Sequence, residues 1–173
     1  MANTWTKIAS TTTSSAVGDV TFFSIPNTYT DLCIKGSARM TSAYTTVEYY
    51  MILNNDGSTL YSGVLGQGYN TTVQSTRVSN TTYANIFNAP AANSTAGVYG
   101  AMSVYIPNYA NTTAFKSYFQ EGVGEINTTA GNNLMFSAGL YRSTAAIFQL
   151  TMLPTGNWET NTTFTLYGIK NTA

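Results

Sequence analysis

The stretch Thr163–Ile169, with the sequence TFTLYGI, carries the clearest signal for the fold. Phe164 and Leu166 alternate with threonines, and an alternation of apolar and polar residues with a period of two is typical of a β-strand with one buried face. Threonine suits such a strand because its branched Cβ packs well on a pleated sheet. We therefore expect Phe164 and Leu166 in the core of a β-protein.

The stretch Phe148–Met152, FQLTM, shows the same period. Its apolar residues Phe148, Leu150 and Met152 are expected to point inward, and the two residues between them outward. This second strand predicts that the C-terminal part of the chain contributes much of the core.

An apolar run at Leu32-Cys33-Ile34 predicts a third buried strand, in which Leu32 and Ile34 point inward. Cys33 is interpreted as a small buried hydrophobic residue, because a single cysteine cannot form a disulfide within the chain. The polar residues that follow are expected on the opposite face: Lys35, Ser37 and Arg39.

Similar patterns recur along the whole chain, separated by clusters of Gly, Pro, Asn, Asp and Ser. The sequence therefore predicts an all-β protein, a single antiparallel β-sandwich or jelly-roll-like domain over residues 1–173, with residues 1–15 or so as an extended N-terminal arm. The expected strands are Thr4–Ala9, Asp19–Ile25, Asp31–Arg39, Thr45–Leu53, Ser58–Leu65, Val73–Val78, Tyr83–Phe87, Val98–Ile106, Phe115–Glu121, Leu134–Tyr141, Ala146–Met152 and Thr163–Ile169.

One turn is specific enough to predict a hairpin. Asn54-Asn55-Asp56-Gly57 separates two strand-like runs, and an Asp-Gly pair favours the positive φ angles of a tight hairpin turn. We expect residues 45–65 to form this hairpin. Six Asn-x-Thr or Asn-x-Ser triplets are interpreted as turns followed by strands, because asparagine tolerates left-handed backbone and caps its own turn. These asparagines are Asn70, Asn80, Asn93, Asn111, Asn127 and Asn161.

Composition excludes several classes of function. Only 8% of the residues are charged, seven cationic side chains balance seven anionic ones, and histidine is absent. We therefore expect no nucleic-acid partner, no zinc site and no catalytic triad containing histidine. The first ten residues, MANTWTKIAS, lack the pattern of an export signal, and no apolar run is long enough to span a membrane. Synthesis in a cytosol and no membrane partner are expected.

Glu121 and Glu125 were tested as an acid and base pair for glycoside hydrolysis. In an extended strand four residues separate them by about 13 Å, beyond the roughly 5–9.5 Å that such chemistry uses. The glycine pairs at 66–68 and 122–124 lack the third glycine and the helix of a dinucleotide site. We predict no enzymatic activity, no catalytic or metal-binding residue and no cofactor.

Tyrosine is frequent, with 13 residues, and several cluster in one region. Adjacent residues of a strand point to opposite faces, so one of Tyr49 and Tyr50 is expected to point outward. Outward aromatic rings serve as cover for a sheet, as anchors between subunits or as platforms for sugars, and the sequence leaves these three roles open. The candidate interface residues are Trp5, Tyr44, Tyr49, Tyr50, Tyr61 and Tyr69.

Three segments then suggest a family. Ser24–Leu32 (SIPNTYTDL), Ile106–Ala110 (IPNYA) and Phe164–Lys170 (FTLYGIK), the last preceded by Gly156-Asn157, resemble small β-rich virion proteins of tailed bacteriophages, notably those of cyanobacteria and other aquatic bacteria. The similarity spans nearly the whole chain, and its matching pieces are strands and turns.

This resemblance implies a structural protein on the capsid surface, assembled in the host cytoplasm. The function it favours is that of a head decoration (cement) protein, a homotrimer that binds the major capsid protein and stabilises the shell. The alternative is a tail-fibre or adsorption module that binds glycans of the host surface.

Overall fold

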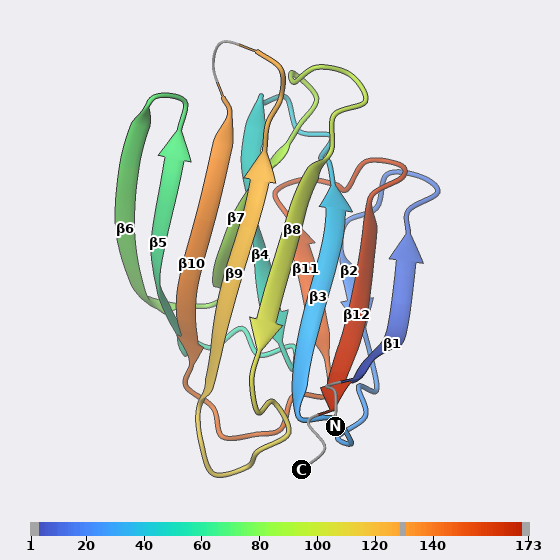
Figure 1. Ribbon diagram of the computed structural model, residues 1–173, viewed down its shortest axis with the longest axis vertical. Helices are drawn as coiled ribbons and strands as arrows, with labels where there is room; N and C mark the ends of the chain where they lie inside the picture. Colours follow the sequence, from blue (N-terminus) through green and yellow to red (C-terminus); the bar gives the residue numbers. More distant parts are fainter. Residues whose placement is uncertain (1–3, 129–130, 171–173) are drawn as a thin grey trace.

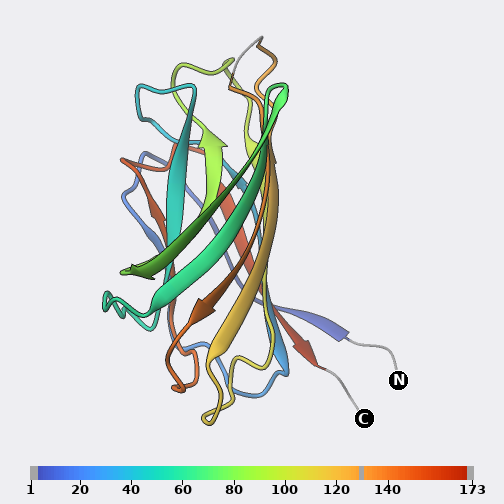
Figure 2. The same cartoon turned by 90° about the vertical axis from the view of Figure 1, so that its left-hand side faces the viewer.

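The computed structural model describes residues 4–128 and 131–170, and twelve β-strands account for the regular structure of this part. The strands form two antiparallel sheets that pack face to face (Figures 1 and 2). The expected all-β sandwich is thereby confirmed. Each expected strand has a counterpart, with bounds that differ by a few residues.

The large sheet has eight strands in the order β1-β12-β3-β8-β9-β10-β5-β6. In that order their bounds are Thr4–Thr12, Thr163–Lys170, Asp31–Ala38, Gly100–Ile106, Lys116–Gly124, Asn133–Tyr141, Tyr61–Tyr69 and Thr72–Thr81. Part of the expected N-terminal arm, from Thr4 to Thr12, is therefore the edge strand β1, which pairs with β12.

The small sheet has four strands in the order β2-β11-β4-β7, with bounds Val20–Phe22, Leu150–Pro154, Thr46–Leu53 and Ala84–Pro90. It covers only part of the inner face of the large sheet, and β5 and β6 extend beyond β7 (Figure 1). One face of the large sheet is thus packed against a second layer, while its other face has no layer over it in the described chain.

The core lies between the sheets. Phe164, Leu166, Leu32 and Ile34 point into it from the large sheet, as expected from their alternation, and Leu150 and Met152 meet them from β11. Cys33 is also buried, as interpreted from the sequence. The alternation in these strands therefore identified the buried face correctly.

Two residues depart from the expected facing. Phe148 was expected in the core and is 54% exposed, because β11 begins only at Leu150 and the preceding segment is irregular. Arg39 was expected on the outer face and is buried, because β3 ends at Ala38 and the chain turns inward. Its guanidinium donates hydrogen bonds to Ser94 Oγ and to three backbone carbonyls, those of Ser94, Thr95 and Val98. Those bonds offset the cost of burying the charge.

The hairpin predicted over residues 45–65 is wrong. β4 belongs to the small sheet and β5 to the large one, so the turn connects the two layers. A tight turn does form, but Asn54 and Asn55 take its positive φ angles, 56° and 54°, and Asp56 N–H closes it on Leu53 O at 3.0 Å. The turn was thus predicted correctly, but the sheet to which the following strand belongs was not.

The interpretation of the asparagine triplets as turns is supported at four positions. Asn70, Asn80, Asn127 and Asn161 have φ angles between 51° and 68°, in the left-handed region. Asn80 lies at a bulge of β6, where Tyr61 pairs with Thr81 and Ser62 with Ser79.

Candidate functional site

Two of the six candidate interface residues are core residues, so the prediction is wrong for them. Tyr49 is 1% exposed and its ring meets that of Trp158 edge to face at 5.2 Å. Tyr61 is completely buried and stacks on Tyr141 with ring centroids 4.8 Å apart. Both rings fill space between the sheets, where a tyrosine buries a large aromatic area.

Tyr61 and Tyr141 also hold the turn between the sheets. The Tyr61 hydroxyl accepts a hydrogen bond from Leu53 N–H at 3.0 Å, and it lies 3.2 Å from Asp56 O. The Tyr141 hydroxyl donates to Asp56 Oδ2 at 2.7 Å. These bonds explain why the chain crosses from one layer to the other at Asp56 instead of folding back on β4.

The other four candidates are accessible and lie on four separate parts of the fold. Trp5 lies on the edge strand β1, Tyr44 in the loop between β3 and β4, and Tyr69 at the end of β5. Tyr50 is half-buried on β4, as expected for the neighbour of an inward Tyr49, and its ring lies 4.1 Å from that of Tyr83. The structure therefore does not bring the predicted interface residues together.

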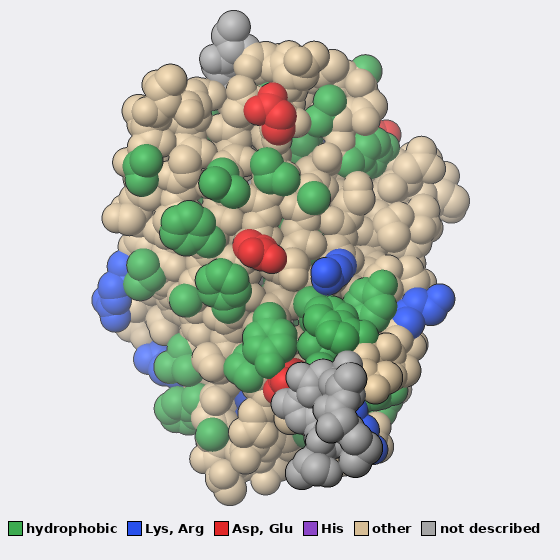
Figure 3. All heavy atoms as spheres, in the orientation of Figure 1, with side chains coloured by type: hydrophobic (Ala, Val, Ile, Leu, Met, Phe, Trp, Pro, Cys, Tyr) green, Lys and Arg blue, Asp and Glu red, His purple; other side chains and the backbone are tan. Residues whose placement is uncertain are grey.

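Instead, exposed apolar side chains gather on the uncovered face of the large sheet, which Figure 3 views from the front. We call this surface the outer apolar face. It comprises seven side chains that are at least one-third exposed, on strands β5, β6, β8, β9 and β10: Val64, Val73, Tyr105, Phe119, Val123, Leu134 and Phe136. Soluble monomers rarely expose a contiguous apolar patch of this kind, and such patches mark interaction sites.

The register of the strands makes this face continuous. Tyr105 pairs with Phe119, and Val123 pairs with Leu134, so apolar residues on neighbouring strands lie directly beside each other. The Phe136 ring lies across Gly66 of β5, where an added Cβ would meet the ring at 2.6 Å. A side chain at position 66 would therefore displace the Phe136 ring from the sheet surface.

Lys35 and Glu121 lie on opposite sides of β8 on this side of the large sheet, with a hollow between them, and Arg77 lies beside Val64 at the β6 edge. Lys35 pairs with Ser103, and Ser103 pairs with Glu121, so the three form one row across β3, β8 and β9. A shallow hollow of about 340 Å³ lies over the same strands, bounded by both charges and by Ala101, Ser103, Val123 and Leu134 among others. Lys35 Nζ leans away from Glu121, toward the Trp5 ring, whose centroid is 5.3 Å from it.

Sequence reasoning missed the outer apolar face although a signal exists. Leu134-Met135-Phe136 and Tyr118-Phe119 are uninterrupted apolar runs within strands, and a strand with one solvated face normally alternates. Such runs predict a strand that is covered on both faces. Alternation by itself identifies only the face of a strand that packs on the core.

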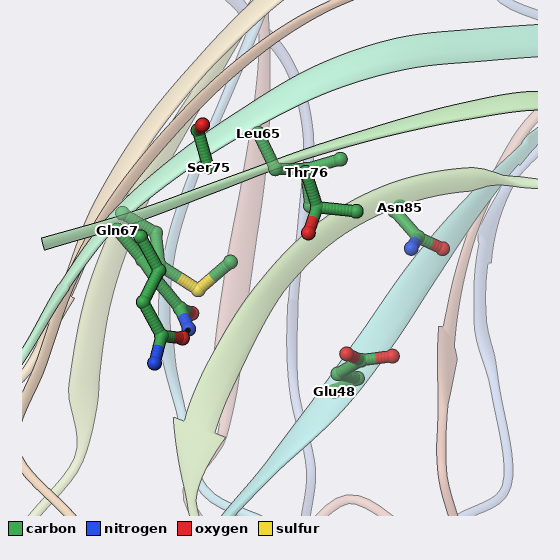
Figure 4. Close-up of a pocket in the computed structure, with 8 residues that line it drawn as sticks. Glu48, Leu65, Gln67, Ser75, Thr76 and Asn85 are labelled. Carbon is green, nitrogen blue, oxygen red and sulfur yellow. Dashed lines mark hydrogen bonds between the residues drawn. The ribbon is translucent and has the colours of Figure 1, made fainter.

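A second feature is a polar pocket of about 100 Å³ between the sheets, where β5 and β6 extend past β7 (Figure 4). Glu48 and Asn85 form one wall, and Gln67 and Thr76 lie across from them. The remaining lining residues are Leu65, Gln74, Ser75 and Met135. We call it the inter-sheet pocket.

The polar atoms of this pocket are incompletely paired within the described chain. Asn85 Oδ1 is buried and accepts no hydrogen bond there, whereas Gln67 Nε2 donates to Gln74 Oε1 at 2.7 Å. Glu48 Oε2 accepts a hydrogen bond from the Tyr50 hydroxyl at 3.1 Å. Asn85 Oδ1 and the Glu48 carboxylate are acceptors in this pocket, so it suits a small ligand that brings hydroxyl or amide donors, or ordered water.

Other chemistry has little support in the part of the chain described. Glu121 points from an extended strand, and no group of three or more acidic or cysteine side chains that could hold a metal occurs among the described residues. Burial raises the pKa of the Cys33 thiol, which favours its neutral, unreactive form. No helix long and apolar enough to cross a membrane occurs among these residues either.

Fold and surface define a class, an all-β sandwich with one uncovered apolar sheet face. Comparison with protein-family models, with curated proteins and with solved structures gave no match for this chain.

Proposed function

We propose that this chain is a structural protein of a bacteriophage virion, most specifically a head decoration protein that binds the major capsid protein and stabilises the shell. The observation that carries the proposal is the outer apolar face, because exposed apolar patches of this kind mark protein interaction sites. The resemblance of the strand and turn segments to phage virion proteins supplies the particular assembly.

The low charge of the chain supports the same proposal. With 8% charged residues and no net charge, neighbouring copies repel each other weakly. A protein that acts in many copies on a symmetric shell gains avidity from repetition and needs only a modest interface per copy. We propose a homotrimer as the form that binds, located on the capsid surface and free of catalytic activity.

Particles that lack this protein test the proposal. We expect purified wild-type particles to contain hundreds of copies, and we expect particles without the protein to lose their DNA at a lower temperature. Quantitative mass spectrometry of particles and a thermal DNA-release assay measure both. A copy number of about a dozen or fewer, typical of a tail component with low-order symmetry, would contradict a role on the shell.

The inter-sheet pocket favours a second candidate, an adsorption module that binds glycans. The hydroxyl groups of sugars can donate hydrogen bonds to Asn85 Oδ1 and to the Glu48 carboxylate. The Tyr50 hydroxyl donates to Glu48, and the Tyr50 ring is partly exposed. This candidate places the function on β4 and β7, not on the outer apolar face.

Sugar binding should then depend on the pocket. We expect saturable binding on a glycan array that Asn85→Leu and Glu48→Gln weaken about tenfold each, the loss of one hydrogen bond to a charged or buried group. Glu125→Gln, which alters an exposed carboxylate outside the pocket, serves as the matched control. The absence of binding to any glycan by the wild-type protein would leave decoration as the proposed function.

A further inference from the structure

No layer of the described chain covers the outer apolar face. The six strands from β12 to β5 carry Lys35, Glu121 and most of the outer apolar face; they span about 29 Å, and the seven residues of β8 span about 23 Å, which gives an area of roughly 670 Å². A standard interface uses about 800 Å² per partner. A two-fold pair therefore uses this area as one interface of nearly standard size, whereas a ring of three divides it into two contacts of about 335 Å² each.

Lys35 and Glu121, which carry opposite charges, lie on opposite sides of β8. Lys35 and Glu121 belong to one row, with Ser103 of β8 midway between them, so each lies one strand, about 4.8 Å, from β8. The half of the face that contains Lys35 also contains Lys7, opposite Tyr167 in the register, and Trp5. The half that contains Glu121 also contains Phe119 and Phe136, with Arg77 at its far edge beside Val64. The central charges of the two halves are therefore opposite.

Rotational symmetry can place Lys35 of one copy opposite Glu121 of another copy. If identical chains surround an axis that runs parallel to the strands and over β8, the Lys35 half of each copy faces the Glu121 half of the next. Opposite charges then meet across each contact, and the phenylalanine-bearing half packs on the half that contains Trp5 and Tyr167. The hollow between Lys35 and Glu121 leaves room for a bulky side chain of the neighbouring copy.

We propose that the outer apolar face is covered by other copies of this chain in a closed ring, with Lys35 of one copy paired to Glu121 of the next. This inference rests on the proposed function in that it names the surface through which the virion protein assembles with itself. The trimer proposed above is one such ring. Contacts with the major capsid protein then fall to surfaces outside this face.

Charge reversal tests the pairing. We expect the wild-type protein to form one closed oligomer in analytical ultracentrifugation and native mass spectrometry. Lys35→Glu and Glu121→Lys each place like charges opposite one another, and each should weaken assembly by about tenfold to a hundredfold. The double variant Lys35→Glu/Glu121→Lys restores opposite charges and should assemble like the wild type. Circular dichroism verifies that each variant is folded.

Asp19→Lys is the matched control for Glu121→Lys, because Asp19 is an exposed acid just before β2 of the small sheet, outside the outer apolar face. Its reversal should leave the mass of the oligomer unchanged. Mixing the two single variants adds a test of ring order. Alternating partners close a dimer with opposite charges at each contact, but a trimer of alternating variants must contain one like-charged contact.

Three results would overturn the inference: a wild-type monomer at micromolar concentrations, single variants that assemble normally, or a double variant that stays dissociated. A different protein as the partner of this face gives the first result, because the purified chain then has no copy to pair with. A monomer that still protects heads against heating would overturn the ring and leave the decoration function intact. A dimeric ring would support the pairing and overturn the trimer.

Discussion

Replacing Trp158 by alanine is expected to lower the free energy of unfolding by about 3–5 kcal/mol, the cost of deleting a large aromatic side chain from a core. Trp158 is completely buried and its ring meets Tyr49 of the small sheet and Phe164 of the large sheet, both edge to face, at 5.2 and 5.0 Å. One ring therefore joins the two layers. A domain of ordinary stability has about 5–15 kcal/mol in total, so this loss is a large fraction.

The backbone of Trp158 adds to this role. It pairs with Val17 and with Met40 in isolated bridges, and the indole N–H donates to Met152 O at 3.2 Å. Trp158→Ala leaves that buried carbonyl without its donor, whereas Trp158→Phe keeps most of the ring volume and loses mainly the hydrogen bond. We expect Trp158→Phe to lower the free energy of unfolding by about 1–2 kcal/mol. The difference between the two variants then separates the contribution of packing from that of the hydrogen bond.

Urea denaturation followed by circular dichroism measures both variants. Phe23 is the matched aromatic control, because it is 69% exposed directly after β2 of the small sheet, outside the outer apolar face. Phe23→Ala should change the unfolding free energy by less than about 1 kcal/mol, as is usual for surface positions. Equal losses for Phe23→Ala and Trp158→Ala would contradict the claim that Trp158 joins the layers.

Local sequence patterns predicted individual strands and turns, whereas the pairing of strands far apart in the chain was not predicted. Alternation at Phe164 and Leu166 predicted both the strand and its buried face, because a period of two depends only on neighbouring residues. The turn at Asn54 was also local and was found. The pairing of β4 with β11, close to the C-terminus, was not, because strand partners are chosen by packing between segments far apart in the chain.

The candidate site shows the same limit. Composition favoured a protein covered by neighbours, and tyrosine frequency suggested which residues would anchor them. The rings of Tyr49 and Tyr61 are in the core, however, because frequency says nothing about which side of a strand faces the second layer. The residues that gather on the outer apolar face come from five strands, and only the register across those strands places them together.

Alkaline pH is expected to unfold the protein cooperatively above about pH 11, because at least three buried tyrosines link proton binding to stability. Burial raises the pKa of Tyr61 and of Tyr118 well above the usual range. Burial, with a hydrogen bond to Asp56, raises the pKa of Tyr141 to about 12. All three rings lie between the sheets, so none can ionise readily while the sandwich is intact.

The sign of the effect follows from these directions. A tyrosine whose pKa is raised in the folded state holds its proton there after the unfolded chain has released it, near pH 10. Its contribution to stability is therefore complete below about pH 10 and is lost as the pH rises toward the folded value. Each such tyrosine removes about 1.4 kcal/mol per pH unit, and three together remove about 4 kcal/mol per pH unit.

Lys116 acts in the opposite direction. Its ammonium is almost completely buried, where it donates to Ala114 O and Thr144 O, and burial lowers its pKa. The folded state therefore gains stability from this lysine as the pH rises toward about 10.5, the usual pKa of the unfolded chain. Above that value the gain is complete, so one lysine cannot offset three tyrosines that continue to lose stability.

Tyrosinate absorbance and near-ultraviolet circular dichroism, recorded on the same pH series, test this expectation. The buried tyrosines should ionise together with the loss of the circular dichroism signal. Tyr118→Phe removes one of the three groups and should reduce the fall of stability with pH by about 1.4 kcal/mol per pH unit, which moves the transition upward. Ionisation of every tyrosine below pH 11 with the signal intact would contradict the argument, because it would mean that these hydroxyls exchange protons with water without opening the space between the sheets.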